Sequence, residues 1–198
     1  MNRKRELLFA QMTSLVWGLQ FAFLSPSLAL FLSSSLGASE GQVGLVLALY
    51  QASGFVASLV IPMIADRKRE YLGVMTVCGV FAIALAVSLS WVSSLALAAL
   101  VLIILGGPAG AGGSLFFAHL NAAGFDHAAV MGARAMTSMA WVAGPPLAML
   151  LARVAGIRSV LVAMATVSVI GIGLVTAMRR NSAPIVGRER RPEDPSTA

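Results

Sequence analysis

The chain has 198 residues, of which 58% are hydrophobic and 11% are charged, and its mean hydropathy is +0.86. Soluble domains carry about 25% charged residues, so this composition excludes a water-soluble globule. The net charge of +6 does not indicate a nucleic-acid partner, because the basic residues gather at the ends of apolar segments rather than along one face.

Five stretches without any charged residue dominate the chain. They cover residues 7–39, 41–65, 71–125, 135–152 and 159–178. A helix needs about 20 apolar residues to cross a bilayer, so four stretches hold one helix each and 71–125 holds two. We predict an all-α integral membrane domain over 1–178, with six transmembrane helices at 7–32, 41–65, 71–90, 94–118, 132–152 and 158–178.

The two ends of the chain differ in character. The basic start, Met1 to Arg5, followed by apolar sequence resembles a signal peptide. The apolar region continues to Leu32, whereas a cleavable signal has about 7–15 apolar residues, so we expect an uncleaved first helix. Residues 179–198 contain three prolines and mixed charges without periodicity, which predicts a disordered cytoplasmic tail.

The basic residues divide unequally between the two sides of the predicted membrane domain. One side carries 12 of the 14 Lys and Arg residues, and the other carries only Arg153 and Arg158. Cytoplasmic segments carry the excess of Lys and Arg, so we predict a multi-pass protein with both termini in the cytoplasm.

Prolines recur in a pattern of three helices plus three. They lie in the first and second predicted helices (Pro26, Pro62) and in the fourth and fifth (Pro108, Pro145, Pro146), but not in the third or sixth. Two inverted three-helix repeats with interrupted helices at matching positions are a common transporter plan. The alternative is that each proline only kinks a packed helix.

Three polar or aromatic residues share one depth near the middle of the membrane. They are Gln20, Gln51 and Trp141. Amides and a flat aromatic face suit a neutral, sugar-like ligand better than an ion, and no Asp or Glu lies in mid-helix to build a carboxylate proton relay. The alternative is that the glutamines join helices by hydrogen bonds and the tryptophan only packs.

A charged turn, Asp66 to Glu70, separates the second and third helices. It serves either as a topology anchor or as part of a gate, in which Asp66 pairs with a cation on another helix. Arg134, isolated at the start of the fifth helix, is the best such cation, because an arginine entering a bilayer must pair, snorkel or line water.

Other residues do not combine into a catalytic, redox or metal site. Gly106, Gly110 and Ser114 are four apart, which predicts close helix contact. Ser114 and His119 point about 140° apart on a helix, and Cys78 is the single cysteine, so neither a serine dyad nor a thiol pair forms. We expect no enzyme, cofactor or metal, since His119, Asp126 and His127 also fit no standard ligand spacing.

Three segments have a distinctive sequence. They are the first-helix stretch from Gln20 to Leu32, the turn with Asp66 and Arg67, and the fifth-helix stretch from Arg134 to Ala148, which contains Ala140-Trp141-Val142 and Gly144-Pro145-Pro146. Together they resemble the sugar efflux transporters of the major facilitator superfamily. The superfamily turn usually reads Gly, three residues, Asp-Arg, one residue, Gly-Arg. Here Pro62 stands at the first glycine, and Arg69 and Glu70 replace the later Gly-Arg.

The resemblance implies half of a twelve-helix transporter in a bacterial inner membrane, which exports a small sugar-like solute by alternating access with possible proton coupling. It implies that Asp66 latches the outward-open state, with Arg67 as the next member of that latch. A half would leave a cavity wall facing lipid, so we expect a second six-helix half or a second copy of the chain. The competing hypothesis is a transport-inactive scaffold or remnant.

Overall fold

The computed structural model describes residues 3–182, and side chains for residues 6–180. Within these residues every regular element is helical. The elements are α1 (Arg3–Leu30), the π turn η1 (Phe31–Ser35), α2 (Glu40–Lys68), α3 (Tyr71–Trp91), α4 (Leu95–Val101), the π turn η2 (Leu102–Gly106), α5 (Gly107–Gly110), α6 (Gly112–Ala122), α7 (His127–Ala155) and α8 (Ile157–Ser182). The predicted tail lies outside the described residues, except for its first residues, which continue α8.

Six helical spans are long and apolar enough to cross a membrane, which confirms the predicted number. The stretch Leu95–Ala122 forms one of them, although it is broken into α4, η2, α5 and α6. The fifth span begins at His127, five residues before the predicted start at 132. The reason is a helix cap, because the Asp126 carboxylate accepts a hydrogen bond from the Ala129 N–H at 2.9 Å.

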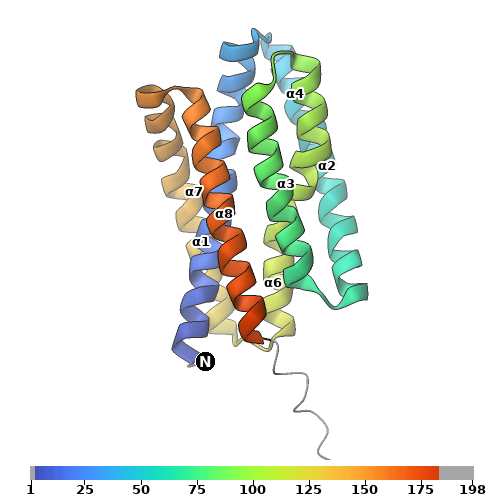
Figure 1. Ribbon diagram of the computed structural model, residues 1–198, viewed down its shortest axis with the longest axis vertical. Coiled ribbons are helices and arrows are strands. Elements are labelled where there is room, and N and C mark those ends of the chain that lie inside the picture. The colour runs from blue at the N-terminus through green and yellow to red at the C-terminus, as the bar shows by residue number, and fades with distance from the viewer. Residues whose placement is uncertain (1–2, 183–198) are drawn as a thin grey trace, which may run out of the picture.

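The helices pack in a repeated order (Figure 1). α1 packs against α7 and α8, the broken fourth span packs against α2 and α3, and α3 packs against α8 between them. The first helix of each triplet therefore contacts the second helix of the other triplet, and the two third helices contact each other. Because each triplet has an odd number of spans, the second triplet is inverted across the membrane, as predicted for two three-helix repeats.

Small residues allow the closest helix contacts. A Cβ added at Gly18 of α1 would meet Ala140 of α7, and a Cβ added at Gly144 of α7 would meet Ala22 of α1. The two helices therefore pack with almost no space between their backbones. In the fourth span Gly106 lies against Tyr50 and Gly107 against Ser53.

The small residues of the fourth span differ from the predicted stripe. Gly106 makes a close contact, but an added Cβ at Gly110 would have no atom within 4 Å, and Ser114 is exposed. Gly107 and Gly112 supply the other close contacts, to Ser53 and Trp17. The spacing of four residues located the right segment but not its contacting face.

The break in the fourth span has a clear local cause. Pro108 has no N–H to donate within the helix, and the π turn η2 shifts the hydrogen-bond register just before it. The Ser53 hydroxyl of α2 donates to the freed Ile103 carbonyl at 2.5 Å. A neighbouring helix therefore satisfies a backbone acceptor that would otherwise be unpaired in lipid.

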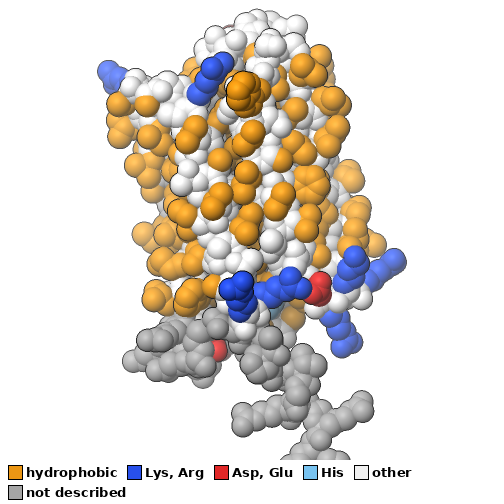
Figure 2. Space-filling view, viewed as in Figure 1, with side chains coloured by type: hydrophobic (Ala, Val, Ile, Leu, Met, Phe, Trp, Pro, Cys, Tyr) orange, Lys and Arg blue, Asp and Glu red, His pale blue; other side chains and the backbone are white. Residues whose placement is uncertain are grey.

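Charged side chains gather at one end of the helical bundle. In Figure 2 most Lys and Arg side chains lie at the lower end, where α2 meets α3 and α8 finishes, and few lie at the upper end. Apolar side chains cover the surface between the two ends. This distribution fits a multi-pass membrane protein.

Candidate functional site

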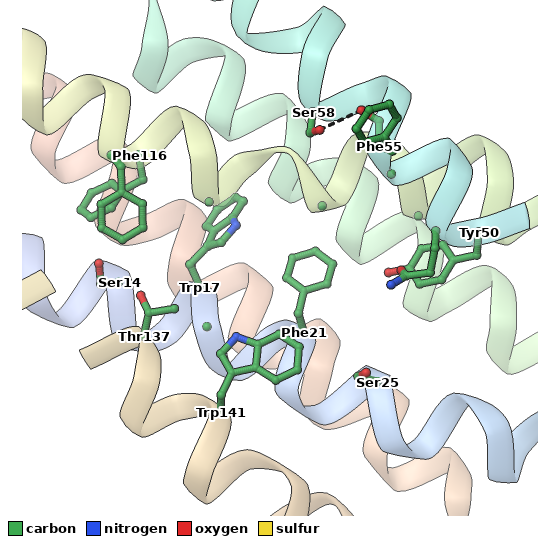
Figure 3. Close-up of a pocket in the computed structure, with 17 residues that line it drawn as sticks. Ser14, Trp17, Phe21, Ser25, Tyr50, Phe55, Ser58, Phe116, Thr137 and Trp141 are labelled. Atoms are coloured by element: carbon green, nitrogen blue, oxygen red, sulfur yellow. Dashed lines mark hydrogen bonds between the residues drawn. The ribbon is translucent and has the colours of Figure 1, made fainter. Parts of the chain in front are cut away.

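A cavity of about 520 Å³ lies between α1, α2, the fourth span and α7. Its volume falls in the range of about 300–1,000 Å³ that is typical of small-molecule sites. Figure 3 shows aromatic side chains entering it from several helices. Its lining residues are Ser14, Trp17, Gly18, Phe21, Ser25, Tyr50, Gln51, Gly54, Phe55, Ser58, Gly106, Gly110, Gly113, Phe116, Phe117, Thr137 and Trp141.

The side chains that line the cavity are all uncharged. Aromatic rings make up much of the wall, and hydroxyls, indole N–H groups and one amide supply the polar side-chain groups. Such a wall offers flat apolar faces and neutral hydrogen-bonding groups. It suits a small uncharged ligand with both an apolar face and polar edges.

The contribution of α1 follows from helical geometry. Ser14, Trp17, Gly18, Phe21 and Ser25 recur at intervals of three or four residues, which places them on one face of the helix. This face alternates small and aromatic residues. The glycine and serines leave the space that the rings of Trp17 and Phe21 then border.

Two of the three expected ligand contacts line this cavity. Gln51 of α2 and Trp141 of α7 lie on different walls, and Trp141 is 47% exposed. Both side chains can therefore reach a molecule in the cavity. Figure 3 shows the Trp141 indole beside Phe21 of α1.

Gln20, the third expected contact, lies on a different face of α1. Its side chain is fully buried, does not line the cavity, and its amide oxygen and nitrogen have no hydrogen-bond partner among the described residues. The prediction used depth alone. Each residue turns a helix by 100°, so Gln20 faces away from the cavity that its neighbour Phe21 lines.

The predicted ion pair between Asp66 and Arg134 is not formed. Asp66 is exposed near the end of α2 and interacts with the hydroxyl of Tyr71, the first residue of α3. The guanidinium of Arg134 lies 5.4 Å from the centroid of the Phe117 ring. Arg67, also exposed, lies at the end of α2 beside Asp66.

A different ion pair joins the two triplets at this end. The Arg179 guanidinium of α8 donates to the Glu70 carboxylate, with 2.7 Å between Nη2 and Oε1. Glu70 is the residue immediately before α3, where its side chain makes no capping hydrogen bond, and it occupies the position where the family turn usually has arginine. The departure from the family pattern therefore provides an acidic partner for α8.

Among the residues that the structure describes, no three His, Cys, Asp or Glu side chains come together to hold a metal ion. The cysteine Cys78 is buried in the core. The polar side chains that line the cavity carry hydroxyls, indoles and the single amide of Gln51.

Sequence reasoning missed most of the cavity wall, including Ser14, Trp17, Tyr50 and Thr137. A signal was present in the spacing of Ser14, Trp17, Phe21 and Ser25 on one helical face. Hydrophobic segments without charge are apolar all round, so such a face does not stand out from lipid-facing positions.

One comparison identifies the family. The family model described as Major Facilitator Superfamily matches residues 12–197. No curated protein matches the sequence. Because the match covers most of the first span and the whole of the other five, this chain belongs to the major facilitator superfamily and is a multi-pass membrane transporter.

Proposed function

We propose that this chain is one half of a secondary active transporter that moves small neutral, sugar-like solutes out of a bacterial cytoplasm. The observation that carries the proposal is the uncharged cavity with aromatic and hydroxyl walls. An ion or a charged solute would leave its charge unpaired against such a wall, which is costly in a membrane. A sugar presents apolar C–H faces to aromatic rings and hydroxyls to polar groups.

Gln51 and Trp141 contact the solute in this proposal. They come from α2 and α7, the second helices of the two triplets, so motion of one triplet relative to the other changes the distance between them. Gln20, which is fully buried and does not line the cavity, makes no contact with the solute in this proposal. This division separates a ligand-binding glutamine from a buried one.

Gating falls to the charged end of the bundle. Arg134 lies over Phe117, and Phe117 lines the cavity, so the cation is one ring away from the solute. Asp66 and Arg67 lie at the turn where the family latch is expected. If both termini are cytoplasmic, this turn lies on the cytoplasmic face of the membrane. The described helices carry no carboxylate on the cavity wall, so a coupling proton would bind on the other half.

A second half, or a second copy of the chain, would cover α2 and α7. These helices expose the most apolar side chains near the cavity opening, among them Phe55, Leu59 and Met63 on α2 and Met139, Val142 and Leu150 on α7. Covering this surface would close the cavity from lipid.

The competing function is a transport-inactive scaffold that needs a separate second half.

Counterflow tests the proposal. Proteoliposomes containing the chain alone, or the chain with a candidate second half, are loaded with unlabelled phenyl glucoside and diluted into the labelled compound. Transient accumulation above the level of empty liposomes supports the proposal. Failure of both preparations, together with correct folding, would favour the inactive scaffold.

A further inference from the structure

Two hydrogen-bonding groups on residues that line the cavity have no partner among the residues that the structure describes. They are the hydroxyl of Ser14, which is 2% exposed, and the indole N–H of Trp17, which is 4% exposed. Both residues line the cavity and lie three positions apart on α1, so they share one helical face. Buried polar groups without partners are rare, because each costs roughly 1–3 kcal/mol.

The Ser14 hydroxyl differs from comparable hydroxyls in this chain. Thr13, Ser27 and Ser168 are also buried, and each donates to the carbonyl four residues back in its own helix. Within the cavity wall, Ser58 and Thr137 also donate to carbonyls of their own helices. Ser14 makes no such bond, so its hydroxyl is a buried donor that no atom of the described residues uses.

The Trp17 indole is held in one orientation by glycines. A Cβ added at Gly112 would clash with the edge of the ring that carries the nitrogen, 2.8 Å from Nε1, and Cβ atoms added at Gly79 and Gly171 would lie 3.6 and 3.7 Å from other ring atoms. A ring so closely surrounded keeps its N–H direction fixed. Figure 3 shows the indole nitrogen on the edge of the ring that is turned toward Phe21.

The chemistry of these two groups defines what they bind. An indole N–H only donates, so its partner must be an acceptor. A hydroxyl one helical turn away can donate to the same atom or to a neighbouring oxygen. Neither group carries charge, and no charged residue lines the cavity, so the matching acceptor is a neutral oxygen rather than a carboxylate or phosphate.

We infer that Ser14 and Trp17 form an oxygen-binding subsite, in which both donate to a hydroxyl or ring oxygen of the neutral solute. This inference rests on the proposed function and specifies the orientation of the ligand. One oxygen edge faces α1, and the apolar face lies against the aromatic wall near Trp141. The pair selects ligands by the position of one oxygen.

Monodeoxy sugars test the subsite. The full chain in lipid nanodiscs is equilibrated with labelled phenyl glucoside, and its 2-, 3-, 4- and 6-deoxy analogues are measured by competition. Loss of a neutral hydrogen bond corresponds to about a three- to tenfold weaker affinity. We expect one analogue to bind that much more weakly to the unmodified chain, and Ser14→Ala to weaken the parent glucoside similarly.

The decisive result is non-additivity. The sensitive analogue should bind Ser14→Ala no more weakly than the parent does, because the bond is already missing. Replacing Trp17 with benzothienylalanine, which keeps the ring shape but lacks the N–H, should give the same pattern. Ser168→Ala is the matched control, since Ser168 is a buried hydroxyl bonded to its own helix outside the cavity.

Other outcomes separate the inference from the proposed function. In one outcome the parent glucoside binds, but both variants, at Ser14 and at Trp17, weaken every deoxy analogue by the same factor as the parent. In that case the two groups bind water or only pack, and the inference fails while the proposed function stands. If no sugar binds the folded chain, both fail.

Discussion

The guanidinium of Arg134 lies over the ring of Phe117, 5.4 Å from its centroid. Arg134 is exposed at the charged end of α7, whereas Phe117 of α6 lines the cavity. The contact therefore links a charge outside the cavity to its wall, and it joins the first two spans of the second triplet through α6 and α7. Any motion that separates α6 from α7 at this end must break it.

We predict that weakening this contact slows transport. A cation–π contact at an exposed site contributes about 0.5–1 kcal/mol, so Phe117→Leu should slow counterflow by about two- to fivefold. Arg134→Ala should slow it further, because the charge is also lost, and Arg134→Lys should fall between the two. Initial counterflow rates measure the effect.

Arg158→Ala is the matched control, since Arg158 is an exposed arginine at the opposite end of the bundle. Its rate should equal that of the unmodified chain. An Arg134→Ala chain that transports at the normal rate would remove Arg134 from the gate.

Glycine packing between α1 and α7 supports a stability prediction. A Cβ at Gly144 would meet the side chain and backbone of Ala22, so Gly144→Ala forces the two helices apart. Overpacking of this kind costs about 1–3 kcal/mol. Unfolding by a denaturing detergent should therefore occur at a lower detergent concentration for Gly144→Ala than for the unmodified chain.

Gly173→Ala tests the specificity of that effect. An added Cβ there meets no atom within 4 Å, and alanine favours helix over glycine, so stability should stay equal or rise slightly. Equal destabilisation by both changes would mean that backbone flexibility, rather than close packing, explains the Gly144 result.

The sequence predicted the spans well because bilayer thickness imposes a length that uncharged stretches reveal directly. It did not predict which side chains meet. Gln20 and Gln51 have similar depths, yet only Gln51 lines the cavity, because the rotation of each helix about its axis is set by packing. The same limit applies to Gly110, which faces open space although Gly106, four residues earlier, contacts Tyr50.

Charge pairing was equally hard to predict from sequence. The sequence predicts that the charged turn is either a topology anchor or a gate in which Asp66 pairs with Arg134, because an arginine entering a bilayer must pair, snorkel or line water. Among the described residues the ion pair at this end joins Glu70 and Arg179 instead. Partners at helix ends depend on which helices are neighbours, here α3 and α8, and that adjacency follows from the inverted packing order. A single sequence carries no direct record of it.

The Glu70–Arg179 pair should contribute little to stability. Its side chains are 55% and 56% exposed, and exposed ion pairs contribute about 0.2–1 kcal/mol. A double-mutant cycle with Glu70→Gln and Arg179→Gln should therefore give a coupling energy below about 1 kcal/mol, which decreases as salt is added. A larger, salt-independent coupling would show that this pair fixes the two triplets together.

The hydrogen bond from Ser53 to the Ile103 carbonyl should matter more to folding than other serine hydroxyls. Interhelical hydrogen bonds in membranes contribute about 0.6 kcal/mol on average and up to about 1.7 kcal/mol. Ser53→Ala should lose stability in the upper part of this range, because the Ile103 carbonyl beside Pro108 loses its donor. Ser138→Ala, whose hydroxyl bonds to its own helix and is exposed, should lose almost none.

The most direct test of the account asks whether a neutral sugar occupies the cavity. Gly110 faces the cavity with no atom near an added Cβ, and the native Cys78 is buried, so Gly110→Cys gives one reactive thiol. Alkylation by N-ethylmaleimide should slow several-fold in saturating phenyl glucoside, whereas a cysteine at exposed Gly41 should react at an unchanged rate. Equal rates at Gly110→Cys with and without the glucoside would contradict the assignment of this cavity as the solute site.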